Sequence, residues 1–286
     1  MAHDKPFGLP VLGAPTADTH AHLDMLDDPA GALERAAVAG VMFVVTVADV
    51  TEAPLGTFDE LPVWLSECER RFEEWDLPQV APPNVRIIVG VHPHNAKDFT
   101  ADVQETLLTL AKDPRVGGIG EIGLDFHYDH SPREHQRRAF EAQLETARIL
   151  NLPVAVHLRE AHEEGLAIMR NQGIPEAGCV IHCFTEGPKT AELFLDLGCD
   201  ISFAGPVTFA KAETIREAVA AVPLENLLAE TDSPFMAPAP YRGRPNEPAW
   251  VTLTIEKIAE IKVVSPAEVA EAAMVNALRV FGRARS

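Results

Sequence analysis

The feature that most constrains the fold of this chain is a regular alternation of short apolar runs with helix-like segments. The runs have the length of buried strands and lack strict polar–apolar alternation, as is typical of parallel strands covered on both faces. Eight such runs favour a (β/α)8 TIM barrel, an α/β fold, over a doubly wound open sheet. The predicted strands are Pro15–His20, Met42–Ala48, Val85–His92, Val116–Glu121, Pro153–Leu158, Cys179–Cys183, Cys199–Phe203 and Leu227–Thr231.

The organisation along the chain indicates one domain. No linker-like shift in composition divides the 286 residues, so we expect a single barrel domain over residues 1–286. The connection at about 51–84 is long for one crossover between strands. Within it Trp64, Cys68, Phe72 and Trp75 recur at helical spacing. We therefore expect an enlarged crossover with a helix packed on the barrel, and a lid or partner-binding role is the alternative.

Two helix starts are marked by the same local chemistry. Ser131 and Ser265 each precede a proline, and a glutamate follows three residues after each serine. This pattern predicts a serine N-cap, a proline at the first helical position and a capping-box glutamate. Helices are therefore expected to begin directly after Ser131 and Ser265.

Composition excludes several classes of protein. Hydrophobic residues make up 47% and charged residues 23% of the chain, which is a globular composition. No apolar run approaches the roughly 20 residues of a membrane span, and the N-terminus lacks a basic segment followed by an apolar one. The expectation is a cytoplasmic protein with no membrane partner. The four cysteines have neither the spacing nor the density of a disulfide scaffold, which predicts reduced, buried thiols.

The net charge bears on possible partners. Lys and Arg number 24 against 43 Asp and Glu, a formal charge of −19. A general nucleic-acid coat is disfavoured, because phosphate binding depends on neutralising cations. A local contact with nucleic acid remains compatible with this balance.

Ionisable side chains collect where the predicted strands end. In a (β/α)8 barrel these carboxyl-terminal ends carry the chemistry. A histidine at one such position is more often structural, but six of the eleven histidines lie there, together with two carboxylates from other strands. These residues are His20, His22, His92, His94, Glu121, His157, His182 and Asp232.

Imidazole and carboxylate groups are the ligands of Zn, Mn, Fe or Ni. His20 and His22 are separated by one residue on a strand, so their side chains point to the same face and can share an ion. Four of the six histidines, taken with the two carboxylates, already exceed the three protein ligands that a catalytic metal usually has. Two metals would use them all, with Glu121 suited to bridge the pair. Such a pair suits the hydrolysis of phosphoesters or amides.

Six segments of the chain stand out at and near the predicted strand ends, namely DTHAHLD (18–24), GVHPH (90–94), GEIGLDF (120–126), PVAVHLR (153–159), IHCF (181–184) and ETDSP (230–234). Together they resemble the TatD family of metal-dependent deoxyribonucleases, within the amidohydrolase superfamily. They follow the order of the family's motifs across almost the whole chain, and residues 242–248 resemble the family's closing motif. Ala21 departs from the Cys or Ser more usual between the first two histidines, and residues 127–129 depart from a common tyrosine-rich run.

The resemblance implies a (β/α)8 barrel that cleaves DNA phosphodiester bonds, as a 3′ to 5′ exonuclease. A hydroxide activated between two divalent ions (Mg, Mn or Zn) is the expected nucleophile. Asp232 and Glu121 are the expected catalytic residues, because the family counterpart of Asp232 also handles the proton of the attacking water. The implied metal ligands are His20, His22, Glu121, His157, His182 and Asp232.

The expected substrate contacts are His92, His94, Arg159, Arg242 and Arg244. Arg159 follows His157 by two residues and should share its face, where a guanidinium can clamp a phosphate. Two metals and these arginines would make the mouth of the barrel locally positive despite the acidic chain. We therefore expect a site-restricted contact with DNA and a shallow dependence on salt.

Two other functions remain open from the sequence. One is a superfamily hydrolase of a small amide, lactone or phosphoester, which an acidic surface favours. No lysine stands at a strand end where a carbamylated lysine would bridge metals, and this absence counts against it. The other is a catalytically idle barrel that binds a partner through the Trp64–Trp75 helix, which the intact set of predicted ligands disfavours.

Overall fold

The strands of the chain form one parallel sheet in sequence order, from β1 to β8. The structure is a computed structural model and describes residues 8–52, 54–77 and 80–282, so both expected domain bounds, 1 and 286, lie outside the described residues. The strands are β1 (Thr16–Ala21), β2 (Val41–Asp49), β3 (Asn84–Gly90), β4 (Val116–Asp125), β5 (Val154–Arg159), β6 (Cys179–Ile181), β7 (Asp200–Phe203) and β8 (Leu227–Ala229).

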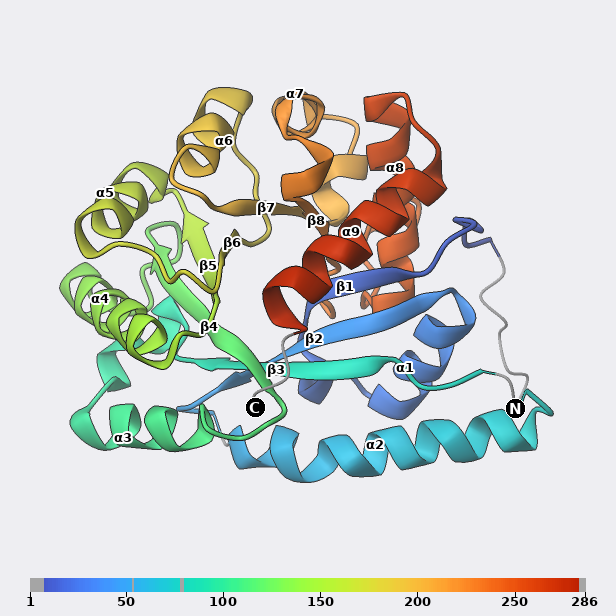
Figure 1. Cartoon of the computed structure of the whole chain (residues 1–286), viewed down its shortest axis with the longest axis horizontal. Helices are drawn as coiled ribbons and strands as arrows, with labels where there is room; N and C mark the ends of the chain where they lie inside the picture. The colour runs from blue at the N-terminus through green and yellow to red at the C-terminus, as the bar shows by residue number, and fades with distance from the viewer. Residues whose placement is uncertain (1–7, 53, 78–79, 283–286) are drawn as a thin grey trace.

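Helices follow the strands and surround them (Figure 1). The expected (β/α)8 barrel is confirmed, and the predicted strands agree closely with the observed ones, apart from β4, which continues beyond Glu121 to Asp125. The helices are α1 (Pro29–Val38), α2 (Pro54–Glu74), α3 (Ala101–Leu110), α4 (Arg133–Leu150), α5 (His162–Gln172), α6 (Pro188–Leu195), α7 (Glu213–Ala221), α8 (Val251–Lys262) and α9 (Pro266–Phe281).

The barrel closes between the end of β1 and the residues that follow β8. Ala21 forms a parallel bridge with Ser233, the backbone N–H of His22 donates to the carbonyl of Ser233 at 2.8 Å, and that of Asp232 donates to the carbonyl of His20 at 2.9 Å. The sheet is therefore nearly closed, and its seam holds the ends of β1 and β8 together.

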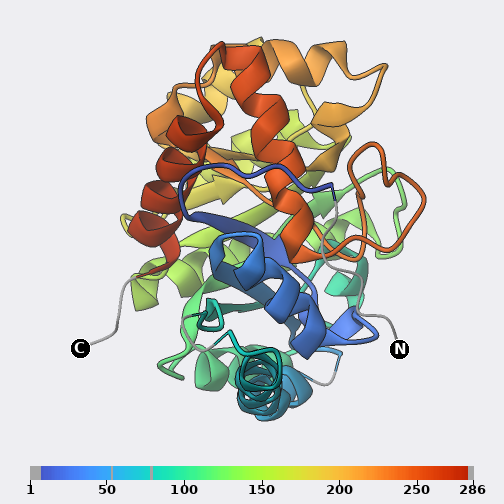
Figure 2. The same cartoon turned by 90° about the vertical axis from the view of Figure 1, so that its right-hand side faces the viewer.

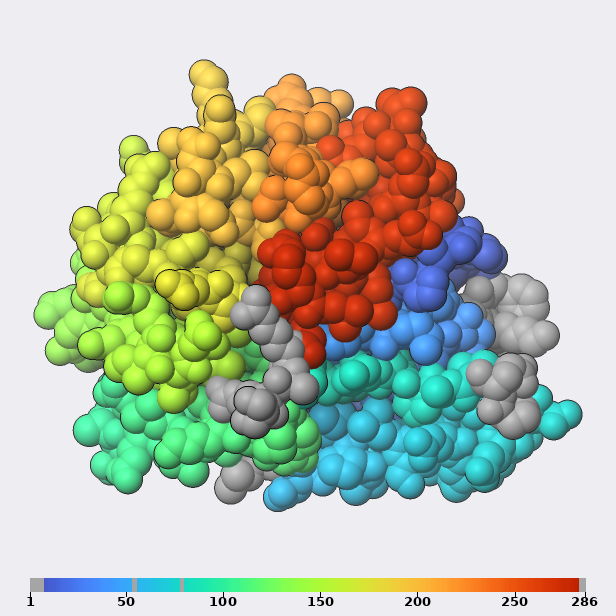
Figure 3. Space-filling view, in the orientation of Figure 1, coloured from blue at the N-terminus to red at the C-terminus, as the bar shows by residue number. Residues whose placement is uncertain are grey.

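The final helix, α9, covers the end of the barrel at which the strands begin. Ala277, Val280 and Phe281 of α9 are buried in one cluster with residues from inside the sheet, among them Phe43 and Leu228. The carbonyl of Phe281 lies against Gly117, where β4 begins. In the space-filling view α9 lies in red across the centre of this face (Figure 3). Because side chains fill this end of the barrel, the space for a cavity lies at the other end, where the strands have their carboxyl termini.

The long crossover before β3 contains helix α2, which lies along one side of the barrel and is seen end-on in Figure 2. Its apolar face is buried, as the spacing predicts, at Trp64, Cys68 and Phe72, whereas Trp75 beyond the helix end is half-buried.

Among the helices of the described residues, none combines the length and the apolar composition of a membrane span.

The two predicted serine caps differ in outcome. Ser265 caps α9 and forms the full capping box with Glu268, as predicted. Ser131 does not cap α4, which begins at Arg133 without a side-chain cap. Its hydroxyl instead donates to the carbonyl of His94 at 2.6 Å and accepts from the N–H of Lys97 at 3.0 Å. The predicted cap at Ser131 is wrong because these longer-range bonds hold the serine to the loop after β3.

Candidate metal centre

A cavity of about 450 Å³ opens among the loops that follow the strands. Figure 2 shows two of these loops at the same end of the barrel, the one after β8 in orange and the one after β4 in green. Most of the residues expected at the site line this cavity, and His20 is fully buried beside it. The predicted residues in the lining are His22, His92, His94, Glu121, His157, Arg159, His182 and Asp232.

Glu121 lies at the centre of the cluster. Its Oε1 is 2.7 Å from both His157 Nδ1 and His182 Nε2, and its Oε2 is 3.3 Å from His20 Nε2. The Nε2 atoms of His92 and His22 lie farther out, at 3.5 and 3.9 Å. Burial raises the pKa of this carboxyl, but the surrounding imidazoles outweigh burial and hold its pKa well below the usual value. Glu121 is therefore ionised at neutral pH.

Asp232 stands at the seam between β8 and β1. Its Oδ1 is 3.5 Å from His22 Nε2, and its backbone lies in the left-handed region at a φ of 54°. Burial opposes ionisation of both side chains, yet their mutual attraction prevails, so the pKa of His22 is raised and that of Asp232 is lowered. The barrel seam thus places a carboxylate beside the first pair of histidines.

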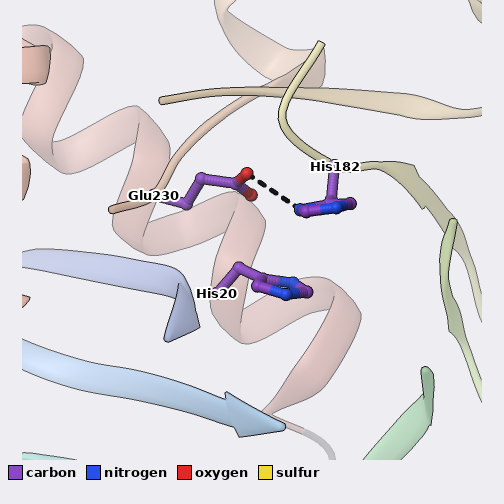
Figure 4. A group of neighbouring side chains, drawn as sticks. All are labelled: His20, His182 and Glu230. Atoms are coloured by element: carbon purple, nitrogen blue, oxygen red, sulfur yellow. Dashed lines mark hydrogen bonds and ion pairs between the residues drawn. The ribbon is translucent and has the colours of Figure 1, made fainter. Parts of the chain in front are cut away.

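His20 and His182 form a stacked pair, with ring centroids 4.0 Å apart (Figure 4). Glu230, drawn beside them, holds His182 through an Oε1–Nδ1 contact of 3.1 Å, and the same oxygen accepts from the N–H of Cys183 at 2.6 Å. Sequence reasoning did not select Glu230. Its position two residues before Asp232 was the available signal, since alternate residues of an extended segment share a face.

Several polar atoms in this cluster lack a hydrogen-bond partner among the described residues. They are Nδ1 and Nε2 of His20 and Oε2 of Glu230, all buried; the 3.3 Å approach of His20 Nε2 to Glu121 Oε2 is an ion-pair distance without a hydrogen bond. An unsatisfied buried polar group is costly, and metal ligation is one way to satisfy it. Three sets have ligand atoms within 4.8 Å of one another, namely His20–His22–Asp232, His92–Glu121–His157 and His20–His182–Glu230. Imidazole nitrogens with carboxylate oxygens fit a divalent transition metal.

His92 and His94 line the cavity, and each also lies beside a carboxylate, His92 beside Glu121 and His94 beside Asp125. His92 Nδ1 accepts from the N–H of His94 at 3.2 Å, and His94 Nε2 is 2.9 Å from Asp125 Oδ2. The same Asp125 oxygen is 3.3 Å from His157 Nε2. Asp125 therefore links the histidines that follow β3 to the histidine of β5.

The three expected arginine contacts separate into two groups. Arg159 lines the cavity, with its guanidinium 4.6 Å from the ring centroid of Tyr128, and forms no ion pair within the described part of the chain. Arg242 and Arg244 are exposed and lie over the rings of Phe209 and Tyr241, outside the cavity lining. Among these arginines, Arg159 alone is in position to meet an anion inside the cavity.

The cavity lining is acidic. It includes six carboxylate residues against the one arginine, Arg159. The protein side chains alone therefore do not make this mouth positive, and bound cations would have to supply the charge that attracts an anion. The carboxylates in the lining are Asp24, Asp49, Glu52, Glu121, Asp125 and Asp232.

Comparison with known proteins gives one consistent group of relatives. A family model described as TatD related DNase matches residues 17–282. The uncharacterized metal-dependent hydrolase YcfH of Escherichia coli K12 is 39% identical over 270 residues, which cover 92% of this chain and 94% of YcfH. The 3′-5′ ssDNA/RNA exonuclease TatD of Pantoea ananatis is 37% identical over 198 residues, covering 68% of this chain and 76% of that protein.

Solved structures agree with this grouping. The structure of YJJV, a TatD homologue from Escherichia coli K12, matches with a TM-score of 0.78 and 28% identity, over 94% of this chain and 98% of that one. A TatD family hydrolase from Entamoeba histolytica matches with a TM-score of 0.75 at 19% identity, over 94% of this chain and 98% of that one, and shows the shared fold.

Proposed function

This chain belongs to the TatD-related DNase family of metal-dependent hydrolases, and from that membership we propose that it cleaves DNA phosphodiester bonds as a 3′ to 5′ exonuclease. The observation that carries the proposal is the histidine cluster around the Glu121 carboxylate, at the base of a cavity open to solvent. Single-stranded DNA is the proposed substrate, as the name of the Pantoea exonuclease suggests.

We propose two divalent cations, Mg, Mn or Zn, as cofactors. The proposed ligands are the six predicted from sequence, with His20, His22 and Asp232 on one side of the centre and His157 and His182 on the other. Glu121 lies between the two groups and would serve both. When bound, such cations stabilise charge on phosphoryl oxygens and make water acidic enough to supply a nucleophile at neutral pH.

Asp232 is the proposed proton acceptor. Its lowered pKa keeps the carboxylate ionised, and it lies in the cavity lining, so it can take a proton from an attacking water. Glu230 acts through His182, whose ring it holds by the Nδ1 contact. A histidine fixed in this way presents its other nitrogen in a defined direction.

Arg159 is the proposed contact with the substrate phosphate. The guanidinium lies over Tyr128 and not against a carboxylate, so its donors remain available for an anion. Because Arg159 is the one arginine in an acidic lining, few phosphates can be neutralised at a time. The proposal therefore keeps the expectation of a site-restricted contact and a shallow dependence on salt.

The acidic lining favours a second candidate, a hydrolase of a small amide, lactone or phosphoester. Six carboxylates around one arginine repel a polyanion such as DNA, whereas an uncharged small substrate meets no such repulsion. The two candidates share the metal centre and differ in what enters the cavity, so the choice of substrate separates them.

Digestion of labelled oligonucleotides tests the proposed function. The protein is stripped with a chelator, and Mg²⁺, Mn²⁺ or Zn²⁺ is then added back with single-stranded DNA or RNA labelled at the 5′ end. We expect no cleavage by the stripped protein and, after metal is restored, a ladder of 5′-labelled products that shorten from the 3′ end. A phosphorothioate linkage at the 3′ end should block the ladder. Turnover of small esters or amides, without oligonucleotide cleavage under any metal, would replace the nuclease by the second candidate.

A further inference from the structure

Three exposed apolar or aromatic side chains stand in the lining of the cavity. Among the described residues with large exposed hydrophobic side chains, only Met25, Tyr128 and Phe235 also line it, and they are 46%, 50% and 50% exposed. The remaining exposed ones lie outside this lining. An exposed apolar group beside a functional cavity is a candidate contact for the substrate.

The Tyr128 ring is already occupied. The Arg159 guanidinium lies 4.6 Å from its centroid, and the His130 ring is parallel to it within 7°, with centroids 5.5 Å apart. Tyr128 thus supports the one arginine of the lining. The ring therefore already has two planar neighbours.

The Phe235 ring, by contrast, is half-exposed and has a single aromatic neighbour among the described residues. Its aromatic contact among the described residues is with His22, at a centroid distance of 5.8 Å and an interplanar angle of 77°. A T-shaped contact of this kind covers at most one face of the ring. At least one face of Phe235 is therefore without an aromatic neighbour, next to a proposed metal ligand.

The backbone under Phe235 is held in place. Its N–H donates to the carbonyl of Asp232 at 2.8 Å, and its carbonyl accepts from the Asn246 amide at 2.8 Å. The same buried amide also donates to the carbonyl of Thr231 at 2.8 Å. A Cβ at Gly205 would come within 1.9 Å of the Met236 carbonyl oxygen, so the glycine allows this segment to pack closely. Because the backbone is fixed in this way, the exposed ring of Phe235 is attached to a segment that is already in place before a ligand binds.

We infer that Phe235 is a stacking platform for a nucleobase next to the scissile phosphate. This inference rests on the proposed function and adds how the cavity recognises a nucleotide. An aromatic ring stacks on every base, so the contact tolerates any sequence. A base within a duplex is already stacked and must first be pulled out, so the platform favours single-stranded ends. The apolar ring also provides attraction that does not depend on phosphate charge, in a lining rich in carboxylates.

The test compares two single-stranded oligonucleotides with the metal-loaded protein. One is natural, and the other lacks the bases of the two nucleotides that flank the first scissile bond. For the wild-type protein, removal of these bases should raise KM by about tenfold, the size of one aromatic–base stack. Phe235→Leu should raise KM for the natural substrate by about the same factor, with kcat nearly unchanged, and should no longer distinguish the two substrates.

Two further variants separate stacking from a structural role. Phe235→Tyr keeps the ring and should restore both the low KM and the discrimination. Val275→Ala on α9 removes an exposed apolar side chain far from the cavity lining and should behave as wild type. Stacking is overturned if Phe235→Leu still distinguishes the substrates, or if the wild-type protein cleaves both with equal KM. If the wild-type protein cleaves neither, the proposed nuclease function is overturned as well.

Discussion

Replacing Glu121 by glutamine should lower kcat/KM for single-stranded DNA by more than about 100-fold. Substitution of a group that only orients a metal ligand typically costs roughly 10- to 100-fold, and Glu121 contacts five histidines directly. Glutamine keeps the shape of the side chain and removes its negative charge. The affinity for Mn²⁺ should fall as well, which calorimetric titration of the metal-free protein measures.

The matched control is Glu52→Gln. Glu52 lines the same cavity, but its carboxylate accepts from the Asn95 amide at 2.7 Å and lies outside the histidine cluster. This variant should keep the metal affinity and kcat of the wild type. If Glu121→Gln retained more than a tenth of wild-type kcat/KM, the central role given to Glu121 would be wrong.

Asp232→Asn should lower kcat by roughly 100- to 10,000-fold, the usual contribution of a general acid or base. Asparagine tolerates the left-handed backbone of this position, and the backbone N–H bond to the His20 carbonyl does not involve the side chain. The variant therefore removes the charge and the proton acceptor while the seam of the barrel stays intact. Single-turnover cleavage at saturating DNA measures the chemical step.

Asp129→Asn is the control matched to this change. Asp129 also has a left-handed backbone, at a φ of 50°, but it is exposed, pairs with Arg133 and lies outside the cavity lining. Both variants should remain folded, and only Asp232→Asn should lose activity. Equal activities of the two variants would remove Asp232 from the reaction.

The barrel could be predicted because each buried parallel strand leaves a local signature. Short apolar runs such as Val154–Arg159 are covered on both faces, so their composition alone indicates a strand. The ends of these runs also located the site, since a (β/α)8 barrel brings them to one face. Residues such as His20 and Glu121, far apart in sequence, could therefore be placed together before any coordinates.

What the sequence did not reveal depends on contacts between distant segments. Ser131 matches a helix cap in its local pattern, but its hydroxyl bonds to the loop that contains His94. Glu230 lies in the same ETDSP segment as Asp232, yet only the structure shows that its carboxylate holds His182. Phe235 has no sequence signal for exposure, since a phenylalanine near a strand end is ordinarily expected in the core. Such roles follow from packing and hydrogen bonding, which one sequence does not display.

The structure shows how charge is distributed at the mouth of the barrel. The sequence suggested that arginines and metals together make the mouth positive, but Arg242 and Arg244 lie outside the cavity lining. Carboxylates dominate the lining, with Arg159 as its one arginine. Attraction of DNA into this cavity is therefore assigned mainly to the bound cations, which makes occupancy of the metal centre the central claim.

Anomalous diffraction from crystals of the protein soaked in Mn²⁺ tests this claim most directly. We predict two peaks within the cluster, one among His20, His22 and Asp232 and one beside His157 and His182, with Glu121 between them. Crystals of Glu121→Gln, soaked in the same way, should show weakened or missing peaks. Absence of any peak in this cluster at saturating Mn²⁺, or peaks only elsewhere on the protein, would contradict the account.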